Sequence, residues 1–191
     1  MLSTRFTLHS LVTEAHKTIR PYLSEQSISI DATMGNGHDT LFLAKHSLKV
    51  YAFDIQEKAI TATRTRLEKN NCIDNVSLIH AGHETMAQHI IPGEKADVIL
   101  FNLGYLPHAD LGIITQKEST LTALNSAINL LSAKGIISII AYPGHCGGQA
   151  ELQAIKHWYK QLDSSLFAIT IIHSMHEQIN SPRLFTIQRS Q

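Results

Sequence analysis

Apolar residues follow two different periods along the chain. Nearly continuous apolar runs, such as residues 98–101, predict strands that are buried on both faces of a sheet. Elsewhere the apolar residues recur at three- and four-residue spacing. In residues 119–133 this spacing puts Leu121 and Leu124 on one face of a predicted amphipathic helix, and Gly135 is its predicted C-cap.

These two patterns alternate through most of the chain. Strands are predicted at about residues 27–33, 49–55, 75–81, 96–102, 136–142, 166–172 and 184–188. Helices are predicted at about residues 8–23, 38–46, 56–70, 119–133 and 149–162, with a short helix around 86–90. The alternation predicts a parallel, doubly wound sheet, and the two strands that close the sequence imply one antiparallel strand. We therefore expect a Rossmann-like α/β fold with a seven-stranded, mostly parallel sheet, one antiparallel strand and helices on both faces.

Composition narrows the class of protein. The 191 residues fit a single domain, 1–191, with a sizeable core. The 16 basic and 16 acidic residues argue against a non-specific polyanion binder, although a local basic patch could still contact RNA. The chain has no apolar run of bilayer length and no signal-peptide pattern, so we expect a cytoplasmic protein without membrane association. Cys72 and Cys146 lack metal-ligand spacing, and we expect no metal.

The most informative stretch runs from Asp31 to Thr40, where a strand, a glycine turn and a helix start follow one another. Gly35 and Gly37 let the backbone approach a ligand closely, and the N–H groups of the helix start are free to face it. Dinucleotide-binding turns need a third glycine, which is missing here, and the Asp31 carboxylate would repel a pyrophosphate. A carboxylate suits the ammonium group of S-adenosylmethionine instead. Asp-x-Thr-x-Gly-x-Gly is typical of class I methyltransferases; the alternative is an ordinary turn with two conformational glycines.

Two further strand ends carry candidate cofactor contacts, because ligands of such sheets bind beyond the carboxyl ends of the strands. The Asp54 carboxylate could accept hydrogen bonds from both ribose hydroxyls, or it could cap the helix that starts at Gln56; the two roles are compatible. After the third strand, His83 could meet the adenine edge, although an acidic residue is more usual there and stands at Glu84. Helix capping or simple exposure is the alternative for His83.

The end of the fourth strand carries candidate catalytic chemistry. It resembles the Asn-Pro-Pro-Tyr motif of amino-methyltransferases, with Leu103-Gly104 in place of the two prolines. The Asn102 amide oxygen could accept a hydrogen bond from a substrate amine and so orient the nitrogen lone pair. Tyr105 could stack on a planar base, and Asp110 could attract the amine or accept its proton. The alternatives are a turn residue at Asn102 and packing or surface roles for the other two.

These considerations give three predicted groups of residues. The predicted cofactor-binding residues are Asp31, Thr33, Gly35, Asn36, Gly37, Asp39, Thr40, Asp54, Gln56, His83 and Asn102. The predicted catalytic residues are Asn102, Tyr105 and Asp110. The predicted substrate-binding residues are Tyr105, His108 and His145, of which His108 is a second candidate proton acceptor and His145 could instead be a surface histidine.

Three motifs together resemble the YtqB/MnmM-type family of class I methyltransferases, described as rRNA methylases. The motifs are residues 31–44, residues 101–107 with Asp110, and Gly144-His145-x-Gly147-Gly148 with Glu151. The resemblance extends from about residue 7 to residue 189. It implies a class I fold, S-adenosylmethionine as donor and a homodimer. It also implies methylation of the aminomethyl nitrogen of 5-aminomethyl-2-thiouridine at the wobble position in the tRNA anticodon loop.

Two other functions remain open from the sequence. The same cofactor could serve methylation of rRNA or of a small-molecule amine, which the lack of strong basicity leaves possible. A non-catalytic nucleotide-binding module is an alternative from another class. The presence of Asp31, Gly35, Gly37, Asp54 and Asn102 together argues against that last function.

Overall fold

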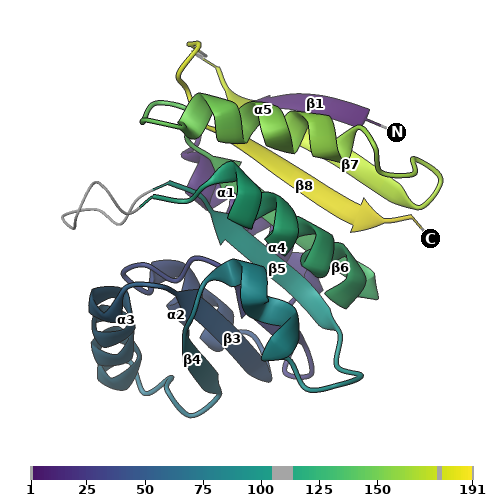
Figure 1. The fold of residues 1–191 in the computed structure, drawn as a ribbon. Helices are drawn as coiled ribbons and strands as arrows, with labels where there is room; N and C mark the ends of the chain where they lie inside the picture. The colour runs from purple at the N-terminus through teal and green to yellow at the C-terminus, as the bar shows by residue number, and fades with distance from the viewer. Residues whose placement is uncertain (1, 105–113, 176–177, 191) are drawn as a thin grey trace.

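The structure is a computed structural model, and it describes residues 2–104, 114–175 and 178–190 (Figure 1). Within these residues the strands form one eight-stranded sheet in the order β1-β7-β8-β6-β5-β2-β3-β4. The strands are β1 (Leu2–Thr7), β2 (Ile28–Asp31), β3 (Lys49–Asp54), β4 (Val76–His80), β5 (Ala96–Asn102), β6 (Leu131–Ala141), β7 (Phe167–Ser174) and β8 (Arg183–Arg189). All neighbours pair in parallel except β8, which runs antiparallel to both β6 and β7.

The sheet has one strand more than the seven that the sequence predicts. The seven predicted strands are all present, and the additional one is β1, which pairs in parallel with β7 at the edge of the sheet. Side chains of β1 are exposed on both faces, including Phe6, so the segment lacks the apolar alternation by which a strand is recognised. Backbone pairing with β7 therefore places β1, and the prediction of seven strands was wrong for that reason.

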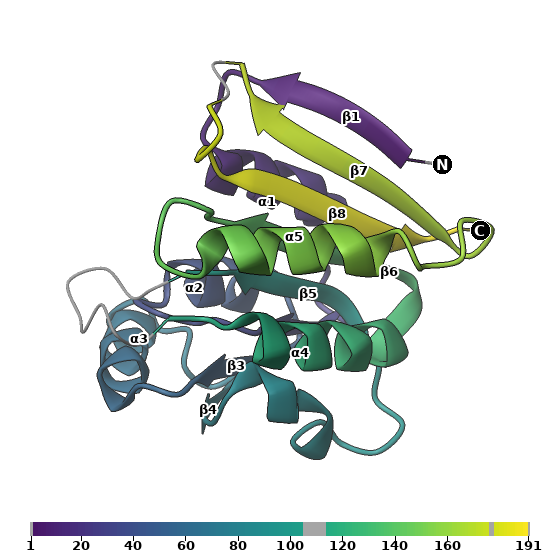
Figure 2. The ribbon, with the colours of Figure 1, turned by 45° about the horizontal axis from the view of Figure 1, so that its top comes forward.

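Helices cover both faces of the sheet, as predicted (Figure 2). They are α1 (Leu11–Ile19), η1 (Arg20–Tyr22), α2 (His38–Ala44), α3 (Glu57–Lys69), η2 (His83–Gln88), α4 (Lys117–Leu130) and α5 (Gly148–Tyr159). Successive residues of β5 point to opposite faces: Phe101 joins the core under η2, α4 and α5, and Leu100 joins the core under η1, α2 and α3. Burial of β5 on both faces explains its continuous apolar run.

Strand β6 begins earlier than predicted and includes Gly135. The strand starts at Leu131, where the sequence predicts the end of a helix, and its pairing with β5 shifts register between Ala96 and Val98. A Cβ on Gly135 would lie 2.9 Å from the Ala96 carbonyl oxygen, so only glycine fits this irregularity. Gly135 is thus a packing residue inside a strand, and its predicted helix-capping role was wrong.

The strand order creates the crevice where a ligand binds in this class of sheet. The chain passes from β2 outward to β3 and β4, and then returns to place β5 on the other side of β2. The helices that come next after β2 and β5, which are α2 and α4, lie on opposite faces of the sheet, and a crevice is expected at the carboxyl ends of these two strands. The candidate residues after β2, β3, β4 and β5 all lie at this edge.

The glycine turn after β2 is tightly packed, and this packing gives the first prediction. Gly37 has φ +76°, and a Cβ there would lie 2.8 Å from the Thr63 Cα in α3. Gly93 has φ +91° with nothing within 4 Å of its added Cβ. Alanine at either position meets backbone strain of about 1–2 kcal/mol, but only Gly37→Ala adds an overpacking cost of roughly 1–3 kcal/mol. Urea denaturation should therefore show a larger loss of unfolding free energy for Gly37→Ala than for the control Gly93→Ala; equal losses would contradict this account.

Candidate active site

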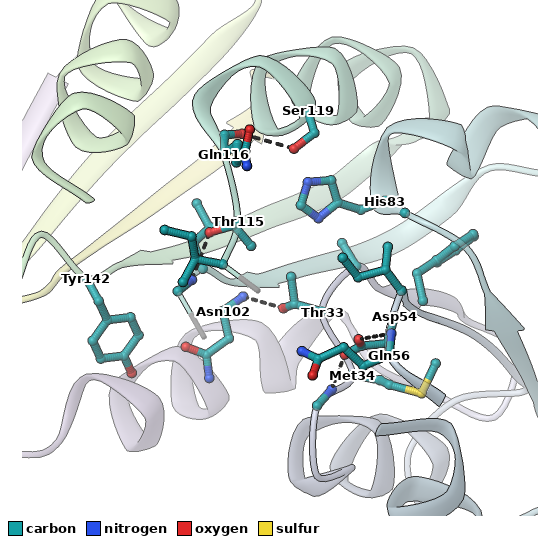
Figure 3. Close-up of a pocket in the computed structure, with 18 of the residues that line it drawn as sticks. Thr33, Met34, Asp54, Gln56, His83, Asn102, Thr115, Gln116, Ser119 and Tyr142 are labelled. Carbon is teal, nitrogen blue, oxygen red and sulfur yellow. Dashed lines mark hydrogen bonds between the residues drawn. The ribbon is translucent and has the colours of Figure 1, made fainter. Parts of the chain in front are cut away.

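A cavity of about 640 Å³ opens at the carboxyl ends of the strands (Figure 3). Its size is typical of sites that enclose small organic ligands. Nine of the predicted residues line it: Thr33, Gly35, Asn36, Asp39, Asp54, Gln56, His83, Asn102 and His145. Asp31, Gly37 and Thr40 are close in sequence but do not line the cavity. Tyr105, His108 and Asp110 lie outside the described residues.

The glycine turn is held in place from both sides. The Gly35 N–H donates to Asp54 Oδ2 at 3.0 Å, and the Gly35 carbonyl accepts from Thr63 Oγ1 at 3.0 Å. Arg66 Nε donates to the Asn36 carbonyl oxygen at 2.7 Å. The end of β3 and helix α3 supply these bonds, so the protein itself fixes the shape of the turn.

Asp54 combines the two roles that the sequence allows. Its Oδ1 accepts from the Gln56 N–H at 2.9 Å, just before α3, while its Oδ2 accepts from Gly35. An ionised carboxylate has about four acceptor positions, more than these two bonds occupy. Burial raises the pKa of Asp54, and the backbone N–H groups of Gln56 and Gly35 partly oppose that rise by favouring the charged form. Ribose binding by Asp54 stays a prediction, and the site has room for it.

Asp31 lies beneath the turn instead of at the cavity surface. It is fully buried and accepts from the Thr33 N–H at 3.1 Å and from Thr40 Oγ1 at 2.6 Å. Burial, followed by the negative charges of Asp39 and Asp54, raises its pKa to about 7. The carboxylate that faces the cavity on this side is Asp39, at the start of α2. Asp31 therefore braces the strand-to-helix turn, and its predicted contact with the ammonium group of the cofactor stays a prediction.

Asn102 is fixed through both its backbone and its side chain. Its N–H donates to Thr33 Oγ1 at 2.7 Å, and its Nδ2 donates to Asp39 Oδ2 at 3.3 Å. Since Asp39 occupies the amide nitrogen, the amide oxygen remains as the acceptor for a substrate group. Figure 3 shows that oxygen on the side of Tyr142. The amine-orienting role of Asn102 stays a prediction, and the position of its amide oxygen is compatible with that role.

His83 is buried against the floor of the cavity. Its ring stands edge-on to Phe101, with ring centroids 5.9 Å apart. Burial lowers its pKa, so the imidazole is neutral at neutral pH. Nε2 finds no hydrogen-bond partner among the described residues. His83 and Glu84 both line the cavity, and the contact of His83 with the adenine edge stays a prediction.

Several cavity residues escaped the sequence analysis. Ile55 is 55% exposed although it is apolar, and it offers a flat aliphatic surface next to Asp54. Tyr142 follows β6, and burial followed by the charge of Asp39 raises its pKa, so its hydroxyl stays protonated at neutral pH. Asn180, between β7 and β8, also lines the cavity, and its Oδ1 accepts from Gln149 Nε2 at 3.1 Å. An apolar residue directly after a strand-end carboxylate was the one signal that could have identified Ile55.

A buried carboxylate joins the two described ends of the segment that follows β5. Glu151 in α5 accepts from Thr115 Oγ1 at 3.0 Å and from Thr120 Oγ1 at 2.6 Å. Thr115 Oγ1 in turn accepts from the Gly104 N–H at 2.9 Å. Burial raises the pKa of Glu151, and the two threonine hydroxyls oppose this. Glu151 thus holds the wall of the cavity beside Asn102 together.

The geometry fits a nucleoside that carries an amino-acid chain. The hydrogen-bonded glycine turn, the Asp54 carboxylate and an apolar face at Ile55 lie on one side of the cavity, and the Asn102 amide lies on the other. This site lies on a sheet whose final hairpin is antiparallel, which defines the class I fold of S-adenosylmethionine-dependent methyltransferases. In the described part of the chain, no cluster of three His, Cys, Asp or Glu side chains is arranged to hold a metal ion. Nor is any described helix long and apolar enough to span a bilayer.

Comparison with known proteins identifies the family to which the chain belongs. Residues 50–188 match the family model described as "Putative rRNA methylase". The chain belongs to this family of S-adenosylmethionine-dependent methyltransferases. It is 35% identical over 153 residues to "tRNA (mnm(5)s(2)U34)-methyltransferase, chloroplastic" of Arabidopsis thaliana, a match that covers 74% of this chain and 56% of the relative. The chain thus spans about half the length of that curated relative.

Two solved structures resemble the chain over nearly its whole length. A protein of Clostridium thermocellum described as a "putative rRNA-methylase" is 34% identical, with a TM-score of 0.91 and coverage of 97% of this chain and 100% of that one. A protein of Streptococcus mutans described as a "putative methyltransferase" in complex with SAH is 37% identical, with a TM-score of 0.88 and coverage of 96% and 100%. The class I methyltransferase fold is thereby confirmed.

The raised pKa of Asp31 makes stability depend on pH. The carboxyl has a pKa of about 4 in the unfolded chain, whereas its pKa in the folded protein is about 7. Between these values the folded state binds more protons, so the stabilisation that is full at low pH is lost as pH rises toward 7. Denaturation across this pH range gives the free energy of unfolding of the wild type and of Asp31→Asn. The value for Asp31→Asn should rise relative to that of the wild type up to about pH 7, and the difference should be constant above it. If the unfolding free energies of the two proteins kept a constant difference at every pH, the raised pKa of Asp31 would be contradicted.

Proposed function

We propose that the protein is an S-adenosylmethionine-dependent N-methyltransferase of tRNA. Its substrate is the aminomethyl group of 5-aminomethyl-2-thiouridine at the wobble position, and its product is 5-methylaminomethyl-2-thiouridine. The observation that carries the proposal is the Asn102 amide, held by Asp39 so that its oxygen is left to accept an amine N–H at the cavity. The name of the Arabidopsis relative, a wobble-uridine methyltransferase of tRNA, supports this choice of substrate.

The residues around the cavity have distinct parts in the proposed reaction. S-adenosylmethionine supplies an electrophilic methyl group when it is bound. Asp54 and the turn at Gly35 hold its nucleoside, and Asn102 accepts a hydrogen bond from the substrate amine, which aims the nitrogen lone pair. As positive charge develops on the nitrogen, the nearby Asp39 carboxylate stabilises it. Asp110 and His108 are the proposed proton acceptors, and Tyr105 the proposed base-stacking residue.

A second candidate keeps the cofactor and changes the substrate to rRNA. The description of the family favours it, as does a match to "Ribosomal RNA small subunit methyltransferase H" of Oenococcus oeni, 35% identical over 81 residues. That match covers 40% of this chain and 26% of the relative, which is less than the tRNA methyltransferase match covers.

We further propose that the protein is a cytoplasmic homodimer and that it acts on the tRNA anticodon loop. The resemblance to the YtqB/MnmM-type family supports both parts of this proposal.

Asp54 and Asn102 should separate cofactor binding from turnover. Asp54→Ala removes the proposed ribose acceptor together with the brace of Gly35, so calorimetry should detect no binding of S-adenosylhomocysteine. Asn102→Ala should weaken that binding far less than Asp54→Ala does and lower kcat by on the order of 100-fold, because the amine loses its orientation. Circular dichroism of both variants controls for folding. Tight binding by Asp54→Ala, or near-normal turnover by Asn102→Ala, would contradict the assigned role.

The choice of substrate can be tested in cells. Mass spectrometry of tRNA nucleosides from a strain that lacks the gene should reveal accumulated 5-aminomethyl-2-thiouridine and loss of its methylated product. Expression of the wild type should restore the product, whereas Asn102→Ala should restore little. An unchanged tRNA profile, with a methyl group missing from rRNA instead, would favour the second candidate.

A further inference from the structure

His16 lies outside every motif considered so far, yet it contacts the site. It belongs to α1, and its Nε2 lies 2.7 Å from Asp39 Oδ1. Its ring stacks on Phe42 in α2, with centroids 3.9 Å apart and planes inclined by 3°. The stacking fixes the plane of the imidazole, and the contact with Asp39 fixes which edge faces the site. His16 is therefore held in one orientation by two independent contacts.

The pairing continues from Asp39 to the amide of Asn102. Asp39 Oδ1 meets His16 and Oδ2 accepts from Asn102 Nδ2 at 3.3 Å, so one carboxylate links the two side chains. An ionised carboxylate only accepts hydrogen bonds, so the hydrogen must be on His16 Nε2 and the nitrogen end of the amide must face Asp39. A reversed amide would place two oxygens with lone pairs against each other.

Asp39 needs such a donor because its surroundings are negative. Its side chain is 10% exposed, and its charge raises the pKa of both Asp31 and Tyr142. Burying a carboxylate costs free energy unless hydrogen-bond donors satisfy it, so the contact of Asp39 with His16 compensates for part of that cost.

We infer that His16 is a positioning residue for methyl transfer: through Asp39 it fixes the Asn102 amide with its oxygen available to the substrate amine. The inference rests on the proposed role of Asn102 as the amine-orienting group. His16 itself does not line the cavity. Its loss should therefore lower kcat while the binding of S-adenosylmethionine is unchanged.

Three variants distinguish this role from simple packing. His16→Phe keeps the ring that stacks on Phe42 and removes the donor to Asp39, and His16→Gln places an N–H near the position of Nε2. His46→Phe is the matched control, because His46 also packs on Phe42 and bonds the Phe42 carbonyl oxygen but does not contact Asp39. Loss of one charge-assisted hydrogen bond predicts a kcat roughly tenfold lower for His16→Phe, with recovery to within about threefold of wild type for His16→Gln. His46→Phe should behave as wild type.

A double-mutant comparison tests the route through Asn102. If His16 acts by orienting that amide, His16→Phe should cost nothing further in an Asn102→Ala background. Independent, multiplying losses would overturn the inference, as would equal losses for His16→Phe and His46→Phe.

A measurement without substrate separates this inference from the proposed function. The side-chain amide signal of Asn102 in an ¹⁵N–¹H spectrum can be assigned by its absence in Asn102→Ala. It should move in His16→Phe and stay in place in His46→Phe. An unmoved signal in His16→Phe would overturn the inference even where tRNA methylation is confirmed. A moved signal would support it even where the wild type proves to methylate another amine.

Discussion

The Asp54 carboxylate joins the two strand ends on which the cavity depends. One oxygen holds Gly35 in the turn after β2, and the other holds Gln56 at the start of α3. Thr63 and Arg66, in that same helix, bond the carbonyls of Gly35 and Asn36. Bonds from the protein itself thus hold the loop, and such preorganisation reduces the ordering entropy that is lost on binding. A single side chain serves both as a structural brace and as the proposed ribose acceptor, since a carboxylate has more acceptor positions than the brace uses.

Negative charge concentrates at the site in a way that suits transfer of a methyl cation equivalent. Asp31, Asp39 and Asp54 lie close enough for the charges of Asp39 and Asp54 to raise the pKa of Asp31. Such a cluster costs stability, because burial disfavours each charge and the charges repel one another. It is compatible with the proposed function, because the reaction moves positive charge from sulfur to nitrogen without removing it from the cavity. The most buried member, Asp31, relieves the repulsion by holding its proton until about pH 7.

The sequence predicted the parts of the fold that burial encodes. Continuous apolar runs identify β5 and β6, and the carboxyl-end rule places Gly35, Asp54 and Asn102 at one cavity. Strand β1 was missed because backbone pairing, which leaves no pattern in the side chains, holds it to β7. The direction of the Asp31 side chain could not be predicted either. Whether a strand-end carboxylate turns toward the cavity or under the turn depends on where Thr40 lies in three dimensions.

The remaining gaps share one physical cause, which is contact between residues far apart in the chain. His16 and Asp39 are separated by 23 positions, and Asp39 and Asn102 by 63. Neither separation matches a helical or strand period, so no local pattern indicates the pairing. The same holds for Glu151, whose two threonine partners lie 36 and 31 positions away. The Asp39 and Glu151 carboxylates each accept two hydrogen bonds from separate parts of the chain. These bonds fix the positions of the residues at the strand ends. A motif therefore identifies which groups are available for the chemistry, while buried carboxylates contributed by neighbouring helices determine how those groups are oriented.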